Sequence, residues 1–434
     1  MKIVILGAGP AGLLLAHYLL SHPNDYQILI YDKRSDPRQI DENKRAFVIG
    51  IGKRGQTVLK TIDGLWPAIK NKGIPVRKSG FYSQKKGEWK VFERYQDADM
   101  CNLLINRNDL CSVLLEELEK KSNPNIDIQF NVTCLDVNLR SHIIKLEDKN
   151  SDFFEQSYDL LVGADGVHSP VRKALMSQPG FDFEQSYFKT HWKVIHIPKP
   201  DFMETETSYG FREFTPSDRI VGAALPEVNN QICLLMFWDQ NPEILNRNPF
   251  NINTVEEMQK KIKETLLPGL ELTNDQAQKL LNKYPSTVVQ TKCNRYHDLE
   301  GKVALIGDAA HGMSSRLGQG CQAAFNDAIA LYKLLVEENN NLSLVLPKYS
   351  EKQVKEGHAI TDMNADLAPR SQWVSFLFNT VMLIRSKLNK KFPNLIKPTA
   401  ATEVSQTLIP YSEIAARFQH WMSLIKWSNE RHLK

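Results

Sequence analysis

Residues 7–12 read GAGPAG and directly follow a short apolar run, residues 2–6. This is a GxGxxG pattern, in which each glycine has its own physical task. Gly7 permits a tight turn, Gly9 lets backbone N–H groups approach a diphosphate, and Gly12 lets the following helix pack closely on the strand. The pattern therefore predicts a strand–turn–helix unit that binds a nucleotide.

The residues after this turn complete the unit. A helical pattern covers residues 11–21, and a second apolar run at 27–31 ends at Asp32. An acidic residue at the end of the second strand can accept hydrogen bonds from ribose hydroxyls. These elements predict a βαβ dinucleotide-binding fold, but by themselves they do not distinguish NAD from FAD.

Three further segments narrow the choice. The sequence DKR occupies residues 32–34, GADGVHSPVR occupies 163–172, and GDAAH occupies 307–311, the last followed by Gly318, Gly320 and Asp327. In this order they resemble the motifs of single-component (class A) FAD-dependent monooxygenases of the aromatic-hydroxylase type. The resemblance implies an FAD cofactor, NADPH or NADH as co-substrate through the segment around Asp165, and O₂ as oxidant. No second GxGxxG is present to bind the nicotinamide cofactor.

The same resemblance implies an α/β fold. We expect a Rossmann-like FAD-binding domain of the glutathione-reductase type, an inserted β-sheet substrate domain and C-terminal helices. The expected FAD-binding domain is discontinuous, and the expected boundaries are 1–75, 100–180 and 290–345 for that domain, 76–99 and 181–289 for the substrate domain, and 346–434 for the helical region.

Several expected cofactor contacts also have a chemical basis. The carboxylate of Asp308, just past an apolar run, can accept from ribitol hydroxyls. The helix after Gly320 starts with free N–H donors and a positive dipole end, which suits the negative charge of a reduced flavin. Arg45 and Arg107 match family arginines near the flavin and its phosphates, although Arg45 could equally be a solvated surface residue. The predicted cofactor-binding residues are Gly7, Gly9, Ala11, Gly12, Asp32, Lys33, Arg34, Arg45, Arg107, Asp165, Asp308, Gly318 and Gly320.

Within the family, the sequence resembles the kynurenine 3-monooxygenase branch in residues 181–198 and 318–327. Tyr95 stands twelve residues before Arg107, as a substrate-contacting tyrosine of that branch does, and is our candidate substrate contact. Phe81 stands where that branch has an arginine that pairs with the substrate carboxylate, and losing such a pair costs about 2–5 kcal/mol. We therefore expect that kynurenine binds poorly and that the substrate is a different compound.

Two other departures from the branch concern the flavin loop and the C-terminal helices. Ser315 replaces a usual proline after GDAAH, which bears on the geometry over the flavin face, and no NYxEMR segment occurs near Asn364. No catalytic acid or base is identified.

The expected reaction is hydroxylation of a small aromatic substrate through a flavin C4a-hydroperoxide. The alternatives are a flavin oxidase, dehydrogenase or halogenase, or a true kynurenine 3-monooxygenase. Halogenation is disfavoured because the segment from Trp192 to Pro198 lacks the second tryptophan of a WxWxIP motif. A non-catalytic FAD-binding scaffold is a further alternative, suggested only by Ser315.

Composition limits the remaining choices. A net charge of +4 is too small to indicate nucleic acid as a partner. The six cysteines form no CxxC pair and the eleven histidines show no metal-ligand spacing, so we expect reduced thiols, no metal site and a cytoplasmic protein. No cleavage site follows the apolar residues 3–20, which argues against secretion. Oligomeric state cannot be inferred.

Two apolar patterns lie near the C-terminus. Residues 373–384 are too short to span a bilayer, and we predict a buried helix there. Ile414, Phe418 and Ile425, with Trp421 and Met422, follow one helix face, which predicts docking on the core, with peripheral membrane contact as the alternative.

The β-rich region carries several aromatic residues. On alternating strands such residues favour the core, with lining of a substrate pocket as the alternative; they are Trp192, Phe211, Phe214 and Trp238.

Overall fold

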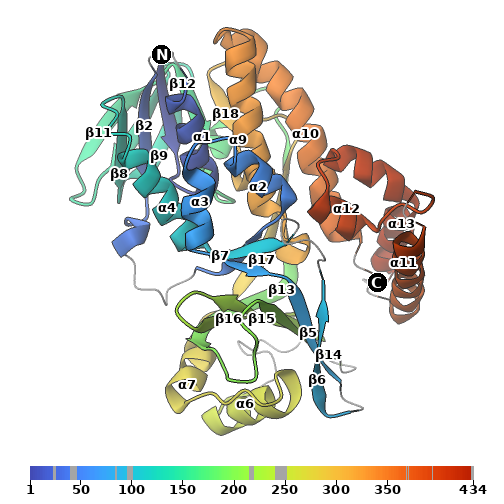
Figure 1. Cartoon of the computed structure of the whole chain (residues 1–434). Coiled ribbons are helices and arrows are strands. Elements are labelled where there is room, and N and C mark those ends of the chain that lie inside the picture. Colours follow the sequence, from blue (N-terminus) through green and yellow to red (C-terminus); the bar gives the residue numbers. More distant parts are fainter. Residues whose placement is uncertain are drawn as a thin grey trace.

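The computed structural model describes residues 1–22, 26–39, 46–83, 86–94, 101–214, 219–239, 252–367, 369, 371–392 and 394–431. Figure 1 shows one sheet with its helices in the upper part of the molecule, a second sheet below it, and helices at one edge formed by the last part of the chain.

A five-stranded parallel sheet forms the centre of the upper part. Its middle strands are buried along nearly their whole length, because helices or other strands cover both faces of a parallel sheet. The carboxyl ends of its strands meet at one edge, where Leu6 pairs with Gly163. In sheet order the strands are β18 (Val303–Leu305), β12 (Leu160–Gly163), β1 (Lys2–Leu6), β2 (Gln27–Asp32) and β8 (Ile126–Phe130).

Helices pack on this sheet through apolar faces. Tyr18 of the first helix stacks on Tyr332 with ring centroids 5.2 Å apart, and His17 bonds the carbonyl of Leu114 at 2.9 Å. These contacts join helices from the beginning, middle and end of the domain. The helices are α1 (Pro10–Leu20), α2 (Lys53–Leu59), α3 (Leu65–Asn71), α4 (Arg107–Glu119), α5 (Pro170–Leu175), α8 (Asp308–His311) and α9 (Gly320–Glu337).

A small antiparallel sheet lies beside β2, where the ring of Tyr31 contacts Phe154 at 6.1 Å. The strand at one edge, residues 153–157, alternates exposed and half-buried residues and contains no β-branched residue, so its sequence gives only a weak signal for a strand. Its order is β11 (Phe153–Ser157), β10 (Ile143–Glu147) and β9 (Thr133–Asn138).

The lower part contains a seven-stranded sheet. Two short helices cover one face of it, with Met258, Ile262 and Leu280 completely buried against the strands. The segment 254–283 contains α6 (Val255–Lys261), a π-helical turn (Ile262–Leu266) and α7 (Asn274–Asn282). In order the strands are β17 (Ser286–Cys293), β13 (Phe183–Pro198), β16 (Gln231–Asp239), β15 (Arg219–Glu227), β14 (Thr207–Phe214), β5 (Lys78–Ser83) and β6 (Glu88–Glu93).

A fourth sheet, which is antiparallel and which the sequence did not predict, connects the two parts. Its residues Val48, Val76 and Leu104 form one apolar cluster with Val194 and Leu235 of the seven-stranded sheet. Because these contacts lie between the two large sheets, they fix how the sheets face each other. The strands are β3 (Val48–Ile51), β7 (Asn102–Asn106) and β4 (Ile74–Val76).

The last part of the chain is helical. As predicted, the apolar face of the final helix docks inward, with Ile414, Phe418 and Ile425 at most 1% exposed. The helices are α10 (Leu342–Asp366), α11 (Gln372–Lys391), α12 (Ala400–Gln406) and α13 (Tyr411–Arg431).

One prediction in this region was wrong. Residues 373–384 do form a helix, within α11, but no residue of α11 whose side chain is described is fully buried, and Trp373 is 83% exposed. The apolar run was interpreted as core because single-sequence patterns do not reveal whether a partner element covers a face. The predicted fold class itself, an α/β FAD-type fold with a separate β-sheet and C-terminal helices, is confirmed.

Candidate cofactor and active site

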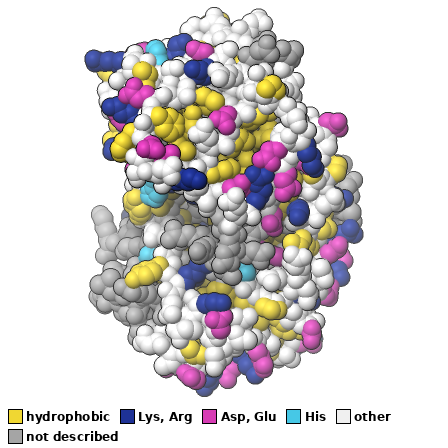
Figure 2. Space-filling model, turned by 90° about the vertical axis from the view of Figure 1, so that its left-hand side faces the viewer, with side chains coloured by type: hydrophobic (Ala, Val, Ile, Leu, Met, Phe, Trp, Pro, Cys, Tyr) yellow, Lys and Arg dark blue, Asp and Glu magenta, His cyan; other side chains and the backbone are white. Residues whose placement is uncertain are grey.

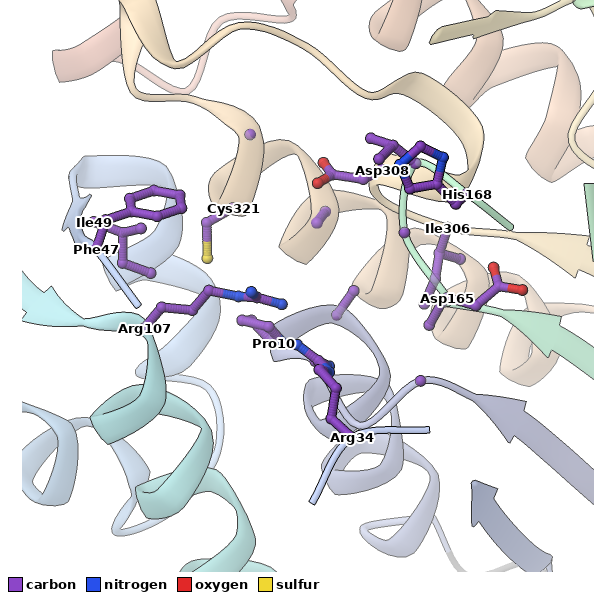
Figure 3. Close-up of a pocket in the computed structure, with 18 of the residues that line it drawn as sticks. Pro10, Arg34, Phe47, Ile49, Arg107, Asp165, His168, Ile306, Asp308 and Cys321 are labelled. Carbon is purple, nitrogen blue, oxygen red and sulfur yellow. The ribbon is translucent and has the colours of Figure 1, made fainter. Parts of the chain in front are cut away.

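A cavity of about 760 Å³ lies where the carboxyl edge of the parallel sheet faces the seven-stranded sheet. Figure 3 shows Arg34, Arg107 and Pro10 on one side of it, Asp308 and His168 on another, and Phe47 with Ile49 beyond Cys321. The predicted cofactor residues that line it are Gly7, Gly9, Ala11, Asp32, Lys33, Arg34, Arg107, Asp165, Asp308, Gly318 and Gly320.

The glycine turn is closely confined by its surroundings. Gly7 has φ of +110°, and a Cβ atom there would lie 2.3 Å from the carbonyl oxygen of Ala164. Gly12 does not line the cavity; a Cβ atom there would lie 2.2 Å from the carbonyl oxygen of Gly7. Both positions therefore exclude side chains. Helix α1 begins after Gly9 without a side-chain cap, so its first N–H groups are free to bind an anion.

Asp32 ends β2 under this turn and is almost completely buried. One carboxylate oxygen accepts from the Arg34 backbone N at 2.8 Å and Nε at 3.0 Å, and the other from Ala8 N at 2.8 Å and Arg34 Nη2 at 2.7 Å. Although burial opposes ionisation, the bonds from Arg34 lower the pKa of Asp32. All four lone-pair positions of the carboxylate are thus used.

Two guanidinium groups lie over the glycine turn. A Cβ atom at Gly9 would be 3.9 Å from Nη2 of Arg107 and 4.0 Å from Nη2 of Arg34. Arg107 is the first residue of α4, which Asn106 caps by accepting from Asn108 N at 2.9 Å. The Arg107 guanidinium donates no hydrogen bond to any described residue and forms no ion pair with one. Two cations beside free N–H groups form a site suited to a diphosphate.

Asp308 faces Arg107 from the other end of the cavity. It follows Gly307, whose φ of +60° turns the chain after β18. Its side chain is exposed on the cavity wall. Desolvation by the surrounding protein raises the pKa of Asp308, and the charges of His311 and Arg107 oppose this.

A buried ion pair holds this turn in place. Asp327 of α9 accepts from Gly307 N at 2.8 Å and bonds His311 Nε2 at 2.5 Å. Although burial opposes the charged form, the Asp327 carboxylate raises the pKa of His311. Asp327 thereby positions the segment that carries Asp308.

Asp165 follows β12 beside the first glycine turn. Burial raises the pKa of Asp165 to about 6, and its Oδ1 atom is buried with no hydrogen-bond partner among the described residues.

The start of α9 points into the cavity. Gly318 has φ of +63°, and Gly320 begins the helix without a side-chain cap. Ser315, the departure from the family proline, begins a short 3₁₀ turn (Ser315–Leu317) that leads into this start. Leu317 N donates to Asn364 Oδ1 at 3.1 Å, and Tyr411 donates to Gln319 at 2.8 Å. The loop thus keeps a defined position against α10 and α13 without a proline.

The side of the cavity toward the seven-stranded sheet is apolar. The residues that form this side were not predicted from the sequence. The alternation of Leu235 and Phe237 along β16, which places both side chains on one face of the strand, could have indicated them. They are Phe47, Ile49, Leu104, Leu225, Leu235, Phe237 and Met313.

The aromatic residues considered from the sequence lie elsewhere. Phe211 and Trp238 belong to the core under α6 and α7, and Trp192 packs against Phe47 at 5.4 Å outside the cavity lining. The side chain of Phe214 lies outside the described part of the chain.

The other residues considered from the sequence are Phe81, Arg45 and Tyr95. Phe81 does not line the cavity; it lies on β5, half exposed, against Phe92 at 5.9 Å. The expected replacement of a carboxylate-binding arginine by Phe81 thus receives no support from its position. Arg45 and Tyr95 lie outside the described residues.

A buried network joins the two parts of the protein beside the apolar wall. His196 Nδ1 bonds Glu227 at 2.6 Å, His196 Nε2 bonds the carbonyl oxygen of Ala46 at 2.9 Å, and Asn106 donates to Glu227 at 3.0 Å. Both partners of the imidazole are acceptors, so the ring binds both only when doubly protonated. Burial opposes that charge, but Glu227 raises the pKa of His196 above 6.5. The network positions the segments that carry Phe47 and Arg107.

The fold and this cavity define a nucleotide-binding flavoprotein of the Rossmann type. The chain belongs to the FAD binding domain family, whose profile matches residues 1–363.

Similar proteins agree with this assignment. Kynurenine 3-monooxygenase of Phaeosphaeria nodorum is 26% identical, over 98% of this chain and 89% of that protein. The Anopheles gambiae enzyme is 28% identical, over 84% of this chain and 73% of that protein. The structure of 2-methyl-3-hydroxypyridine-5-carboxylic acid oxygenase matches with a TM-score of 0.67 at 20% identity, covering 93% of this chain and 95% of the other, and so shows the same fold.

The predicted family is thus confirmed: the chain is an FAD-dependent monooxygenase with kynurenine 3-monooxygenases as distant relatives. Its cofactors are FAD and, as in this class, NAD(P)H. Within the described residues, no helix combines the length and the apolar character of a membrane span. The described residues also contain no cluster of His, Cys, Asp and Glu side chains suited to a metal ion.

Proposed function

We propose that this protein hydroxylates a small aromatic substrate, using NAD(P)H and O₂. One observation carries the proposal: a single cavity joins the glycine turn with its two guanidinium groups, Asp308 with the start of α9, and a continuous apolar wall. The first two sets of groups suit the two ends of FAD, and the wall suits an aromatic ring beside the flavin.

The chain's residues fit FAD as follows. The N–H groups after Gly9, with Arg34 and Arg107, would hold the diphosphate, and Asp308 would accept from ribitol. A ribose hydroxyl that donates to Asp32 would replace one Arg34 contact; the Arg34 side chain is 45% exposed and free to turn outward. The start of α9 would stabilise negative charge on the ring edge. Bound FAD supplies the chemistry, accepting a hydride from NAD(P)H and activating O₂ for insertion into the substrate.

The apolar wall also bears on the substrate. Of the described residues lining the cavity, the cationic ones are Lys33, Arg34 and Arg107 on the glycine-turn side, and none lies on the wall near Leu235 and Phe237. A substrate ring beside this wall gains from burial of apolar area, whereas a free carboxylate there would lose hydration without compensation. We propose a substrate other than kynurenine on this basis.

Kynurenine itself is the second candidate, favoured by the names of the relatives. A titration with kynurenine that shows tight binding, with efficient formation of 3-hydroxykynurenine, would establish it instead.

The test is a screen of the FAD-loaded enzyme with a panel of aromatic compounds. We expect a yellow protein whose NAD(P)H oxidation accelerates with one compound and yields its hydroxylated product. Protein that cannot be loaded with FAD contradicts the proposal. Hydrogen peroxide as the sole oxygen product with every compound would indicate an oxidase.

We also propose that the FAD-binding domain, the substrate domain and the helical region have the boundaries that we predicted from the sequence.

A further inference from the structure

The outer face of α11 is an exposed apolar stripe. Trp373 is 83%, Phe376 69% and Leu377 50% exposed, and the stripe continues three turns further along the helix. Spacings of three and four residues place these side chains on one face. We name it the α11 stripe; it consists of Trp373, Phe376, Leu377, Leu383, Ile384 and Leu388.

The opposite face of α11 is already used for packing. Phe378 meets Trp421 of α13 edge-on at 5.3 Å, and the Arg385 guanidinium lies 4.8 Å above the ring of Phe418. The α11 stripe therefore faces away from the protein. In Figure 1, α11 lies at the outer edge of the C-terminal helices, on the side of the molecule away from β11. Nothing within the chain's described residues covers this surface.

The segment of the chain that contains the stripe carries charge of a single sign. Between Asp366 and Glu403 the sequence contains six basic residues and no acidic one. Lys387 and Lys391 are exposed on α11, and neither forms an ion pair with a described residue. By contrast, basic and acidic side chains are interspersed on the face shown in Figure 2. The basic residues are Arg370, Arg385, Lys387, Lys390, Lys391 and Lys397.

This charge selects between possible occupants. A second copy docked on the same stripe would bring two basic segments together, with no acidic residue of the segment to balance them. An anionic bilayer surface offers both apolar depth and negative headgroups, and amphipathic helices with Trp, Phe and Leu on one face and Lys or Arg beside them bind such surfaces. A 20-residue helix is about 30 Å long and can lie in the plane of the membrane without crossing it.

We infer that α11 is a membrane-docking element. The α11 stripe enters the headgroup region of an anionic bilayer, and Lys387 and Lys391 contact the lipid phosphates. This inference is independent of the proposed substrate and reaction.

Vesicle co-sedimentation of the FAD-loaded full-length protein tests it. We expect at least tenfold stronger partitioning to vesicles with about 30 mol% phosphatidylserine than to pure phosphatidylcholine, weakening at high salt. Trp373→Ser combined with Phe376→Ser and Leu377→Ser should reduce this partitioning by about tenfold or more. Phe153→Ser, at a 72% exposed site on β11, is the matched control and should leave it unchanged.

A second variant keeps the inference testable if the triple variant misfolds. Lys387→Glu with Lys391→Glu leaves the α11 stripe itself unchanged and should lower partitioning to anionic vesicles by about thirtyfold. Absence of binding to either vesicle type overturns the inference, as does binding that survives both variants. A concentration-dependent dimer in light scattering that the triple variant abolishes would assign the stripe to a second copy instead.

Discussion

The two sides of the cavity are built by different means. On the glycine-turn side, the backbone sets the shape: side chains are excluded at Gly7 and Gly12 by carbonyl oxygens less than 2.5 Å from where a Cβ would be. On the side of the seven-stranded sheet, the shape depends on which apolar residues stand at Leu225, Leu235 and Phe237. A fold can therefore keep its cofactor site while its substrate changes, because only the second side varies without backbone movement.

Substitution on the glycine-turn side should have the largest effect. Gly7→Ala combines a positive φ with a clash against Ala164, and we expect a loss of about 4 kcal/mol in unfolding free energy and loss of FAD binding. Chemical denaturation and flavin content measure both. Gly180→Ala is the control, because Gly180 has φ of +69° but open space around its Cβ position; it should cost about 1 kcal/mol. Equal effects at both sites would refute the steric argument.

Removing a guanidinium tests the same side through charge. Arg107→Ala should weaken FAD binding by about thirtyfold, because it deletes one charge-assisted contact to the diphosphate. Fluorescence titration of the FAD-free protein measures the dissociation constant. Arg140→Ala, at an exposed position remote from the cavity lining, serves as control. An unchanged FAD affinity for Arg107→Ala would show that Arg107 does not contact the cofactor.

The opposite side should respond differently. Phe237→Ala removes part of the apolar wall and so enlarges the cavity. We expect KM for the aromatic substrate to rise about tenfold while FAD affinity stays the same. Steady-state kinetics and flavin titration separate the two. A parallel loss of FAD would mean that the two sides are not independent.

This contrast also explains what could be predicted from the sequence. That the glycine turn, Asp32, Asp308 and the start of α9 line one cavity could be predicted, because each requires a particular residue type at a fixed distance from a strand or helix end. The wall was missed because any large apolar residue satisfies it, so its members look like core.

The same reasoning applies to α11. Its apolar spacing predicted a helix correctly, but whether that face is covered depends on partners that local sequence does not encode. The connecting sheet of β3, β7 and β4 was missed because its strands, three to five residues long, pair only through long-range contacts.

The stabilisation that the His196–Glu227 network contributes between the two sides should depend on pH. The pKa of His196 is raised in the folded protein. The stabilisation is therefore complete below the unfolded value of about 6.5 and is lost as pH rises through the folded pKa. We expect the unfolding free energy of the wild type to exceed that of His196→Gln by about 1–2 kcal/mol below about pH 6.5, with the difference shrinking as pH rises through the folded pKa of His196. Chemical denaturation of both proteins at a series of pH values measures this difference. The titration of the nearby Glu227 and Lys283 must be included in the fit. A difference that grows with pH would contradict it.

The smallest effect concerns Ser315. Ser314 has φ of −67° and ψ of 153°, an extended conformation that a following proline favours. Ser315 begins the 3₁₀ turn, and its backbone N–H donates to no backbone carbonyl among the described residues. Ser315→Pro should therefore stabilise the fold by about 0.5 kcal/mol by restricting the unfolded chain. Ser315→Ala separates the loss of the hydroxyl from the effect of the ring. Because the loop already bonds Asn364 and Gln319 contacts Tyr411, FAD affinity should not change. A Ser315→Pro variant that is destabilised would show that this loop is held differently from the family's proline-containing loop.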